Sequence, residues 1–194
     1  MKKIIIILFS IILVGSLIIG NPFKDRTELF HREDDESVLF LGWQIDRTIT
    51  EIDIPKGVTT VGDNAFANCE NLSYVNFPNS LSRIGRYAFQ YCTSLESITL
   101  PEGLLTIGTY AFKHCESLVS IEIPANVNYV SDRAFSDCYA LETVTFKGKP
   151  SRIHDNVFIN CNSLKTISVP WSKGMVNGAP WGADESVQII YNCQ

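Results

Sequence analysis

The sequence predicts an α/β-type repeat solenoid, and three observations support this prediction. First, residues 55–169 consist of one unit that is repeated five times with a period of 23 residues. Second, each copy carries the pattern Phe-x-x-Cys-x-x-Leu at the same place. Third, each copy contains a stretch in which apolar and polar residues alternate. A fixed period of 20–50 residues is typical of solenoids, propellers and arrays, in which each unit buries its apolar face against the next.

Five columns of residues, each with a spacing of 23, define the repeat. They are Phe66, Phe89, Phe112, Phe135 and Phe158; Cys69, Cys92, Cys115, Cys138 and Cys161; Leu72, Leu95, Leu118, Leu141 and Leu164; Val75, Ile98, Ile121, Val144 and Ile167; and Val61, Ile84, Ile107, Val130 and Ile153. We expect these columns to form one continuous core, because no copy has enough apolar surface to fold alone.

The N-terminal part of the chain, up to Ser37, differs from the repeats. Residues 1–20 place two lysines before the uncharged run Ile4–Ile19, which predicts either a secretory signal peptide or an uncleaved N-terminal membrane anchor. Both interpretations export the rest of the chain, so the expected location is secreted or cell surface. Residues 21–37 are polar, contain an acidic cluster at residues 33–36, and are interpreted as a linker.

Degenerate copies of the repeat flank the five full ones. Residues 38–54 are predicted to form an N-terminal capping half-repeat, in which Trp43 lies one period before Phe66 and Ile52 one period before Val75. Residues 170–194 are predicted to form a C-terminal capping repeat. Here Trp181 continues the phenylalanine column, Asp184 occupies the cysteine column, and Val187 and Ile190 continue the Leu72 and Val75 columns. Atypical terminal repeats are expected, because one face of a terminal coil has no neighbour.

Each copy is predicted to contain two strands and a turn. Val75 and Phe77 alternate with Tyr74 and Asn76, which indicates a half-buried strand, and the following proline ends it. A second short strand leads to a glycine at Gly62 and its equivalents. The spacing of three between Phe, Cys and Leu then predicts a short helical or 3-10 turn.

The cysteine column is interpreted as a ladder of buried thiols. It lacks the close Cys-x-x-Cys pairs of a zinc site. Stacked coils would place neighbouring cysteines about 4.8 Å apart with parallel Cβ directions, which suits disulfide geometry badly. A free cysteine packs as a small apolar residue. Cys193 stands outside the column and is predicted to be a free thiol.

Two linked motifs resemble a known family. Leu72-x-x-Val75-x-Phe77-Pro78 and Leu81-x-x-Ile84-Gly85-x-x-Ala88-Phe89-x-x-Cys92 resemble the BspA-like leucine-rich repeat of bacterial and protist surface proteins. The resemblance implies a leucine-rich-repeat-like right-handed coil, with a parallel β-sheet on the concave side and short helical or 3-10 turns opposite. It also implies secreted or cell-surface proteins, some of which bind extracellular-matrix or host proteins or aid adhesion, and it implies no catalytic residues.

The polar residues predict no catalytic, cofactor or metal site. His31, His114 and His154 share no column. Asp63, Asp132 and Asp155 do share one, but Arg86 and Thr109 interrupt it, so solvated turn acids are favoured over a calcium site. No nucleophile–base pair or glycine-rich phosphate loop is present in the sequence, and we expect no enzyme. The net charge of −5 argues against a nucleic-acid partner.

The outward strand face is the candidate protein-binding surface, because curved solenoids bind partners there. Its residues are Tyr74, Asn76, Glu96, Ser97, Thr99, Ser120, Glu122, Thr143, Thr145 and Thr166. Tyr74 is the one aromatic anchor among them. The alternative is that Ser and Thr simply suit exposed strand positions. Tyr87 and Tyr110, with Arg133 continuing their column, form a second candidate patch on a lateral edge.

The sequence therefore predicts an exported, monomeric leucine-rich-repeat protein that acts as a protein–protein interaction or adhesion module through its concave sheet face. The expected partner is an extracellular or host protein, and membrane contact is expected only through residues 1–20 if they are not cleaved. The alternative is a structural, envelope-associated repeat protein held by that uncleaved segment, without a specific soluble partner.

Overall fold

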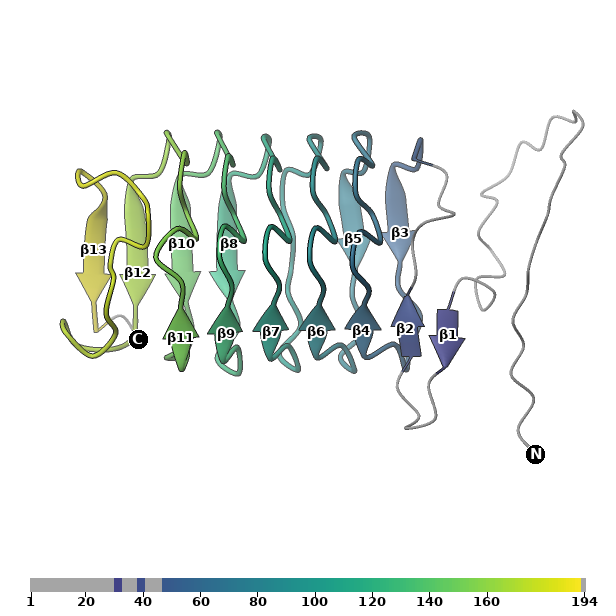
Figure 1. Ribbon diagram of the computed structural model, residues 1–194, viewed down its shortest axis with the longest axis horizontal. Helices are drawn as coiled ribbons and strands as arrows, with labels where there is room; N and C mark the ends of the chain where they lie inside the picture. Colours follow the sequence, from purple (N-terminus) through teal and green to yellow (C-terminus); the bar gives the residue numbers. More distant parts are fainter. Residues whose placement is uncertain (1–29, 33–37, 41–46, 193–194) are drawn as a thin grey trace, which may run out of the picture.

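The computed structural model describes residues 30–32, 38–40 and 47–192, and these residues form coils stacked along one axis (Figure 1). The predicted signal segment, most of the polar linker, Trp43 and Cys193 lie outside the described residues. The strands are β1 (Phe30–Arg32), β2 (Val38–Phe40), β3 (Glu51–Asp53), β4 (Thr60–Val61), β5 (Tyr74–Asn76), β6 (Arg83–Ile84), β7 (Thr106–Ile107), β8 (Ser120–Ile123), β9 (Tyr129–Val130), β10 (Thr143–Phe146), β11 (Arg152–Ile153), β12 (Thr166–Val169) and β13 (Gln188–Tyr191).

Two rows of strands run along the stack (Figure 1). One row is a seven-stranded sheet in the order β1-β2-β4-β6-β7-β9-β11, and it is parallel except between β1 and β2. The other row consists of the pair β3-β5 and the four-stranded sheet β13-β12-β10-β8, all parallel. From β4 to β11, each strand pairs with one 23 positions away, as Val61 does with Ile84. The predicted parallel-sheet repeat solenoid is confirmed.

The phenylalanine column lies at the centre of the core, as the repeat predicts. The five rings are fully buried. Neighbouring rings from Phe66 to Phe158 are stacked with centroids 4.9, 5.2, 5.1 and 5.9 Å apart, and their planes differ by 3° to 18°. The leucine, valine and isoleucine columns are buried around this stack. Each coil therefore completes the core of its neighbours, as expected for a solenoid.

The segment between the two strands of each coil is not helical, so the predicted helical or 3-10 turns are wrong. No helix, and therefore no membrane-spanning helix, is found in the described part of the chain. Instead, two residues four positions apart have positive φ in four successive coils. The pairs are Asn64 (60°) and Asn68 (62°), Tyr87 (55°) and Tyr91 (60°), Tyr110 (57°) and His114 (58°), and Arg133 (53°) and Asp137 (60°).

These left-handed residues make the N–H groups of the turn alternate between two kinds of partner. The N–H groups of Phe66 and Asn68 donate to carbonyls of the next coil, each at 2.7 Å. Between them, the N–H of Ala67 donates within its own coil to the carbonyl of Asn64 at 3.1 Å. A helix would direct every such group along its own axis. Pairing with the adjacent coil satisfies the same groups and binds the coils together.

The five column cysteines are buried and free, so the predicted thiol ladder is confirmed. From Cys92 onward, each thiol donates a hydrogen bond to a phenylalanine carbonyl of the preceding coil, at 3.0 to 3.3 Å. Burial raises the pKa of the Cys92, Cys115 and Cys138 thiols. A thiol with a raised pKa stays protonated, so these three thiols act as apolar packing.

The C-terminal coil is displaced by one residue from the period. β12 pairs with β13 at a spacing of 22, which aligns Ile167 with Ile189. The predicted placement of Ile190 in the Val75 column is therefore wrong: Ile190 is 38% exposed, whereas Ile189 packs against the core. Trp181 is fully buried, and its ring lies near those of Phe146 and Trp171.

Candidate interaction surface

The outward face of the second row of strands carries the residues predicted to bind a partner. Alternation along each strand separates these side chains from the buried ones, as in β8, where Ser120 and Glu122 are exposed while Ile121 and Ile123 are buried. Tyr74 is 54% exposed, whereas Thr145 and Thr166 are half-buried. The structure places Tyr74 and Asn76 on β5, Ser120 and Glu122 on β8, Thr143 and Thr145 on β10, Thr166 on β12, and Glu96, Ser97 and Thr99 in the coil between β5 and β8.

This face falls into two blocks. Ser120, Thr143 and Thr166 are directly aligned across β8, β10 and β12. Tyr74 and Asn76 are aligned with Glu51 and Asp53 of β3 instead. The extended residues 97–100 between the blocks form no strand. The predicted binding residues therefore do not lie on one continuous sheet, although all of them face outward.

Ion pairs use some of the charges on this face. Glu122 pairs with Lys147 at 3.0 Å, and Glu142 with Lys165 at 2.8 Å. Exposed pairs of this kind contribute about 0–1 kcal/mol. Asn76 Nδ2 donates to Asp53 Oδ1 at 3.1 Å. The sequence reasoning missed Lys147 and Asp53. Asp53 could have been found one period before Asn76, but Lys147 does not lie one period from Glu122, so the repeat gave no signal for that pair.

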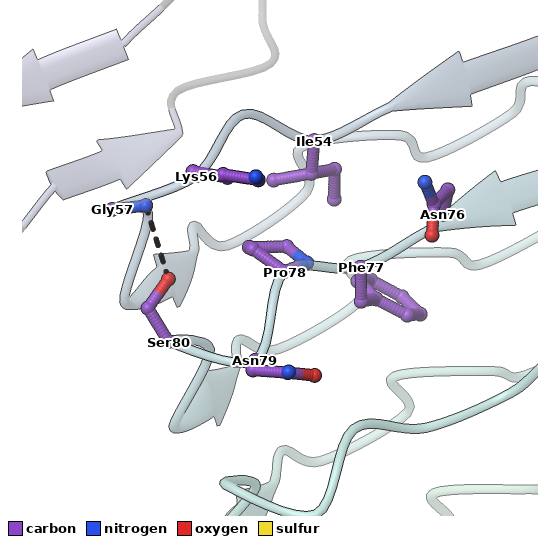
Figure 2. Close-up of a pocket in the computed structure, with 8 residues that line it drawn as sticks. All are labelled: Ile54, Lys56, Gly57, Asn76, Phe77, Pro78, Asn79 and Ser80. Carbon is purple, nitrogen blue, oxygen red and sulfur yellow. Dashed lines mark hydrogen bonds between the residues drawn. The ribbon is translucent and has the colours of Figure 1, made fainter.

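Two shallow depressions adjoin β5, and Asn76, Phe77 and Asn79 line both of them. The smaller one, of about 280 Å³, also contains Tyr74 and Ser97. The larger one, of about 370 Å³, is lined by Ile54, Lys56, Gly57, Asn76, Phe77, Pro78, Asn79 and Ser80 (Figure 2). Both combine apolar surface with amide and hydroxyl groups, which suits side chains of a protein partner. The described residues contain no group of three or more His, Cys, Asp or Glu that could hold a metal ion.

The turns form a second polar and aromatic edge. The rings of Tyr87 and Tyr110 stack with centroids 5.0 Å apart, and Arg133 Nη1 donates to Tyr110 Oη at 2.7 Å. The second predicted patch is thus brought together. The hydrogen bond to Tyr110 raises the pKa of Arg133. The ring faces are covered by each other and by Lys113 and Arg133, so this ladder is largely engaged in contacts within the protein.

A parallel ladder, which the sequence reasoning missed, runs beside it. The rings of Tyr91 and His114 stack at 4.5 Å, and His114 Nε2 lies 3.8 Å from Asp137 Oδ2. Burial opposes ionisation of Asp137, but the hydrogen bond from Asn160 at 2.7 Å and the nearby charges of His114 and Lys113 outweigh it and lower its pKa. The regular spacing of Tyr91, His114 and Asp137, one period apart, was the signal available in the sequence.

Comparison with known proteins gives one family. Residues 45–170 match, in six copies, the family described as BspA type Leucine rich repeat region. A leucine-rich repeat protein from Bacteroides ovatus is 35% identical, with a TM-score of 0.63 over 74% of this chain and 37% of its own. A leucine rich cell surface protein from Faecalibacterium prausnitzii is 26% identical, with a TM-score of 0.69 over 82% of this chain and 41% of its own. The leucine rich repeat protein of T. pallidum is 25% identical, with a TM-score of 0.62 over 72% of this chain and 80% of its own.

The chain spans about two fifths of the length of the first two of these structures. No curated protein matches it.

Proposed function

Because the chain belongs to the BspA-type leucine-rich repeat family, we propose that it is an exported protein-interaction module that binds an extracellular or host protein. The binding surface is the outward face of the second strand row, which the family resemblance assigns to the concave side. The protein acts as a monomer, in adhesion or a related surface contact, and carries out no catalysis. One structural neighbour, from Faecalibacterium prausnitzii, is described as a cell surface protein.

The observation that supports this proposal most directly is the division of each strand between two roles. The inward residues repeat from coil to coil and are buried in the core. The outward residues change from coil to coil and remain accessible, and Tyr74 stands 54% exposed beside a depression that also contains Asn76 and Thr99. A tyrosine next to polar hydrogen-bonding groups is the composition expected of a binding hot spot.

Two measurements test the proposal. Purified matrix proteins and an envelope fraction of the producing cell are immobilised, and binding of the wild type is compared with that of Tyr74→Ala. The matched control is Tyr139→Ala, which removes a tyrosine of similar exposure (40%) from the turn edge. We expect binding to a purified matrix protein that Tyr74→Ala weakens at least tenfold and Tyr139→Ala does not; a tenfold loss corresponds to about 1.4 kcal/mol.

Export is tested separately, by cell fractionation and N-terminal sequencing of the mature protein. A protein that is retained inside the cell would refute the export part. Exclusive association with the cell's own envelope, unaffected by Tyr74→Ala, would favour the structural role in place of the binding role.

A further inference from the structure

The outward face of the seven-stranded sheet carries a second, chemically different column. In β4, β6, β7, β9 and β11, the second residue is buried and the first points outward. The outward residues are aligned strand by strand in the sheet register. They are Thr60, Arg83, Thr106, Tyr129 and Arg152. We call this set the Arg–Tyr column.

The two arginines of the Arg–Tyr column have no ionic partner among the described residues. The cations that form ion pairs there are Lys113, His114, Arg133, Lys147 and Lys165. Neither Arg83 nor Arg152 donates a side-chain hydrogen bond within this part of the chain, and both are exposed. A guanidinium group presents five donors in a planar fork that matches a carboxylate. Two such groups are therefore accessible on one face.

Two acidic residues at the turns that follow these strands, Asp63 and Asp132, are already engaged. Asp132 lies 3.7 Å from Arg133 Nη1. Asp63 accepts the backbone N–H of Arg86 at 2.7 Å. These carboxylates are held at the turns and do not neutralise Arg83 or Arg152, so a partner can supply the opposing charge.

Apolar surface lies between the two arginines. Tyr129 is 51% exposed, and Leu105, whose carbonyl accepts the Tyr129 N–H, is 44% exposed. Accessible apolar side chains on neighbouring coils provide surface that a partner can cover. Tyrosine and arginine are also the residue types that dominate binding energy in interfaces.

The spacing of the column fits an extended peptide. Arg83 and Arg152 are three strand spacings apart, on β6 and β11, which corresponds to about 14 Å. In an extended chain, residues four positions apart point the same way and lie about 13–14 Å apart. The residue midway between them points to the same side, and it would meet Tyr129 and Leu105.

We propose that the Arg–Tyr column binds an extended acidic segment of a partner protein. The segment lies along the axis of the stack, across the strands. Carboxylates at positions i and i+4 bind Arg83 and Arg152, and an apolar side chain at i+2 packs on Tyr129 and Leu105. The chain's net charge of −5 disfavours a continuous polyanion, whereas two discrete carboxylates meet only the two free arginines.

The test measures binding of a short fluorescent peptide with glutamates at i and i+4, isoleucine at i+2 and threonine elsewhere. Fluorescence anisotropy with the full chain should show binding that weakens as salt rises. Arg83→Gln and Arg152→Gln should each weaken it roughly fivefold, as expected for one exposed charge-assisted contact, and Tyr129→Ala should weaken it to a similar extent. Lys173→Gln is the matched control, because it removes the same charge outside the column and should leave binding unchanged.

A second peptide separates geometry from charge. Its second glutamate is moved to i+3, which points to the opposite side of an extended chain, and it should bind roughly fivefold more weakly than the first. Equal binding of the two peptides, or equal displacement of the first by inorganic polyphosphate at matched charge, would show simple anion attraction and overturn the proposal. So would binding that Arg83→Gln and Arg152→Gln leave intact. The Tyr74→Ala variant should bind the peptide normally, which keeps this surface distinct from the one proposed above.

Discussion

The phenylalanine column is packed differently in the middle of the stack and in the C-terminal coil. In the middle, the Phe112 ring lies between Phe89 and Phe135 with centroids 5.2 and 5.1 Å away, and its N–H donates to the carbonyl of Ala134, just before Phe135. At the C-terminal coil, Trp181 replaces phenylalanine, and the Phe158 N–H donates to the carbonyl of Trp181 itself, one position later than in the regular coils. The strand register changes from 23 to 22. The strand spacing of 23 is thus kept where the column keeps phenylalanine, and it changes in the coil where tryptophan replaces it.

The cysteine column shows the same contrast. Cys115 is fully buried, and its thiol donates to the carbonyl of Phe89 at 3.3 Å. In the C-terminal coil the equivalent residue is Asp184, which is exposed and accepts the N–H of Ser186 at 2.8 Å. A carboxylate could not be buried in the middle of the stack without a partner. The last coil accepts it because the position there lies in solvent.

The largest expected effect is a loss of global stability when a ring in the middle of the stack is removed, whereas the same change in the C-terminal coil should act locally. Phe112→Ala should destabilise the protein by about 3–5 kcal/mol, because the cavity would open between two stacked rings. Trp181→Ala should cause a smaller loss of global stability, because a terminal coil of a solenoid can unfold without its neighbours. Urea unfolding measures the first effect. Amide hydrogen exchange locates the second, which should be confined to residues 170–192.

Phe112→Leu is the control for this pair, because it keeps most of the buried volume and should cost markedly less than Phe112→Ala. Faster exchange throughout residues 55–169 in Trp181→Ala would contradict the idea that the C-terminal coil opens independently.

An intermediate effect is expected at glycines, for different reasons in the two regions. A Cβ at Gly108 would lie 2.6 Å from the carbonyl carbon of Gly85, so Gly108→Ala must push two coils apart and should cost about 1–3 kcal/mol. Gly174, in the C-terminal coil, has a φ of 86° and open space around it. Gly174→Ala should cost about 1 kcal/mol through backbone strain alone. Denaturant midpoints measure both changes.

Ser131→Ala is the matched control, since Ser131 already carries a Cβ in the Gly108 column and loses only its hydroxyl. It should leave the midpoint nearly unchanged. If Gly108→Ala also left the denaturant midpoint unchanged, the close approach of the coils at this column would not limit stability.

Much of the middle could be predicted from the sequence because one register repeats there. The spacing of 23 was enough to predict the parallel strands, the stacked phenylalanines and the thiol ladder. Alternation along the strand was enough to predict that Tyr74 faces outward. The turns were predicted wrongly because a spacing of three suits both a helical turn and a series of β-turns. The choice depends on hydrogen bonds to the adjacent coil, which the sequence of one copy does not contain.

The outward surface was predicted less well, for a related reason. Residues 97–100 alternate like their equivalents on β8, yet they form no strand, and the face is divided there. The outward residues of the seven-stranded sheet could not be predicted, because its strands are very short and have no hydrophobic alternation of useful length. The strand pairing, which aligns Arg83, Tyr129 and Arg152, defines that face.

A smaller effect is expected from Asp137, which belongs to the regular coils. Its pKa is lowered by Asn160, His114 and Lys113 in spite of burial. A carboxyl with a lowered pKa in the folded state stabilises the protein above its ordinary pKa near 3.9, and this contribution is lost as the pH falls. Asp137→Asn should therefore reduce stability at neutral pH and make little difference at low pH. Urea unfolding of both proteins from pH 7 to pH 3 measures the difference; a gap that persisted at low pH would show that the loss is not ionic.

The smallest effect is expected from Asp184, the counterpart in the C-terminal coil. Hydrogen bonds from the hydroxyl and the backbone N–H of Ser186 lower its pKa, so its stabilising effect also belongs to neutral pH and fades on acidification. The carboxylate is exposed, and solvent weakens the interaction. Asp184→Asn should therefore leave the global unfolding midpoint unchanged while it speeds amide exchange at Ser186 and Val187 near pH 7. Acidification should remove that difference. A shift of the global midpoint would show that the C-terminal coil unfolds together with the regular coils, and the contrast between the two regions would then be one of packing alone.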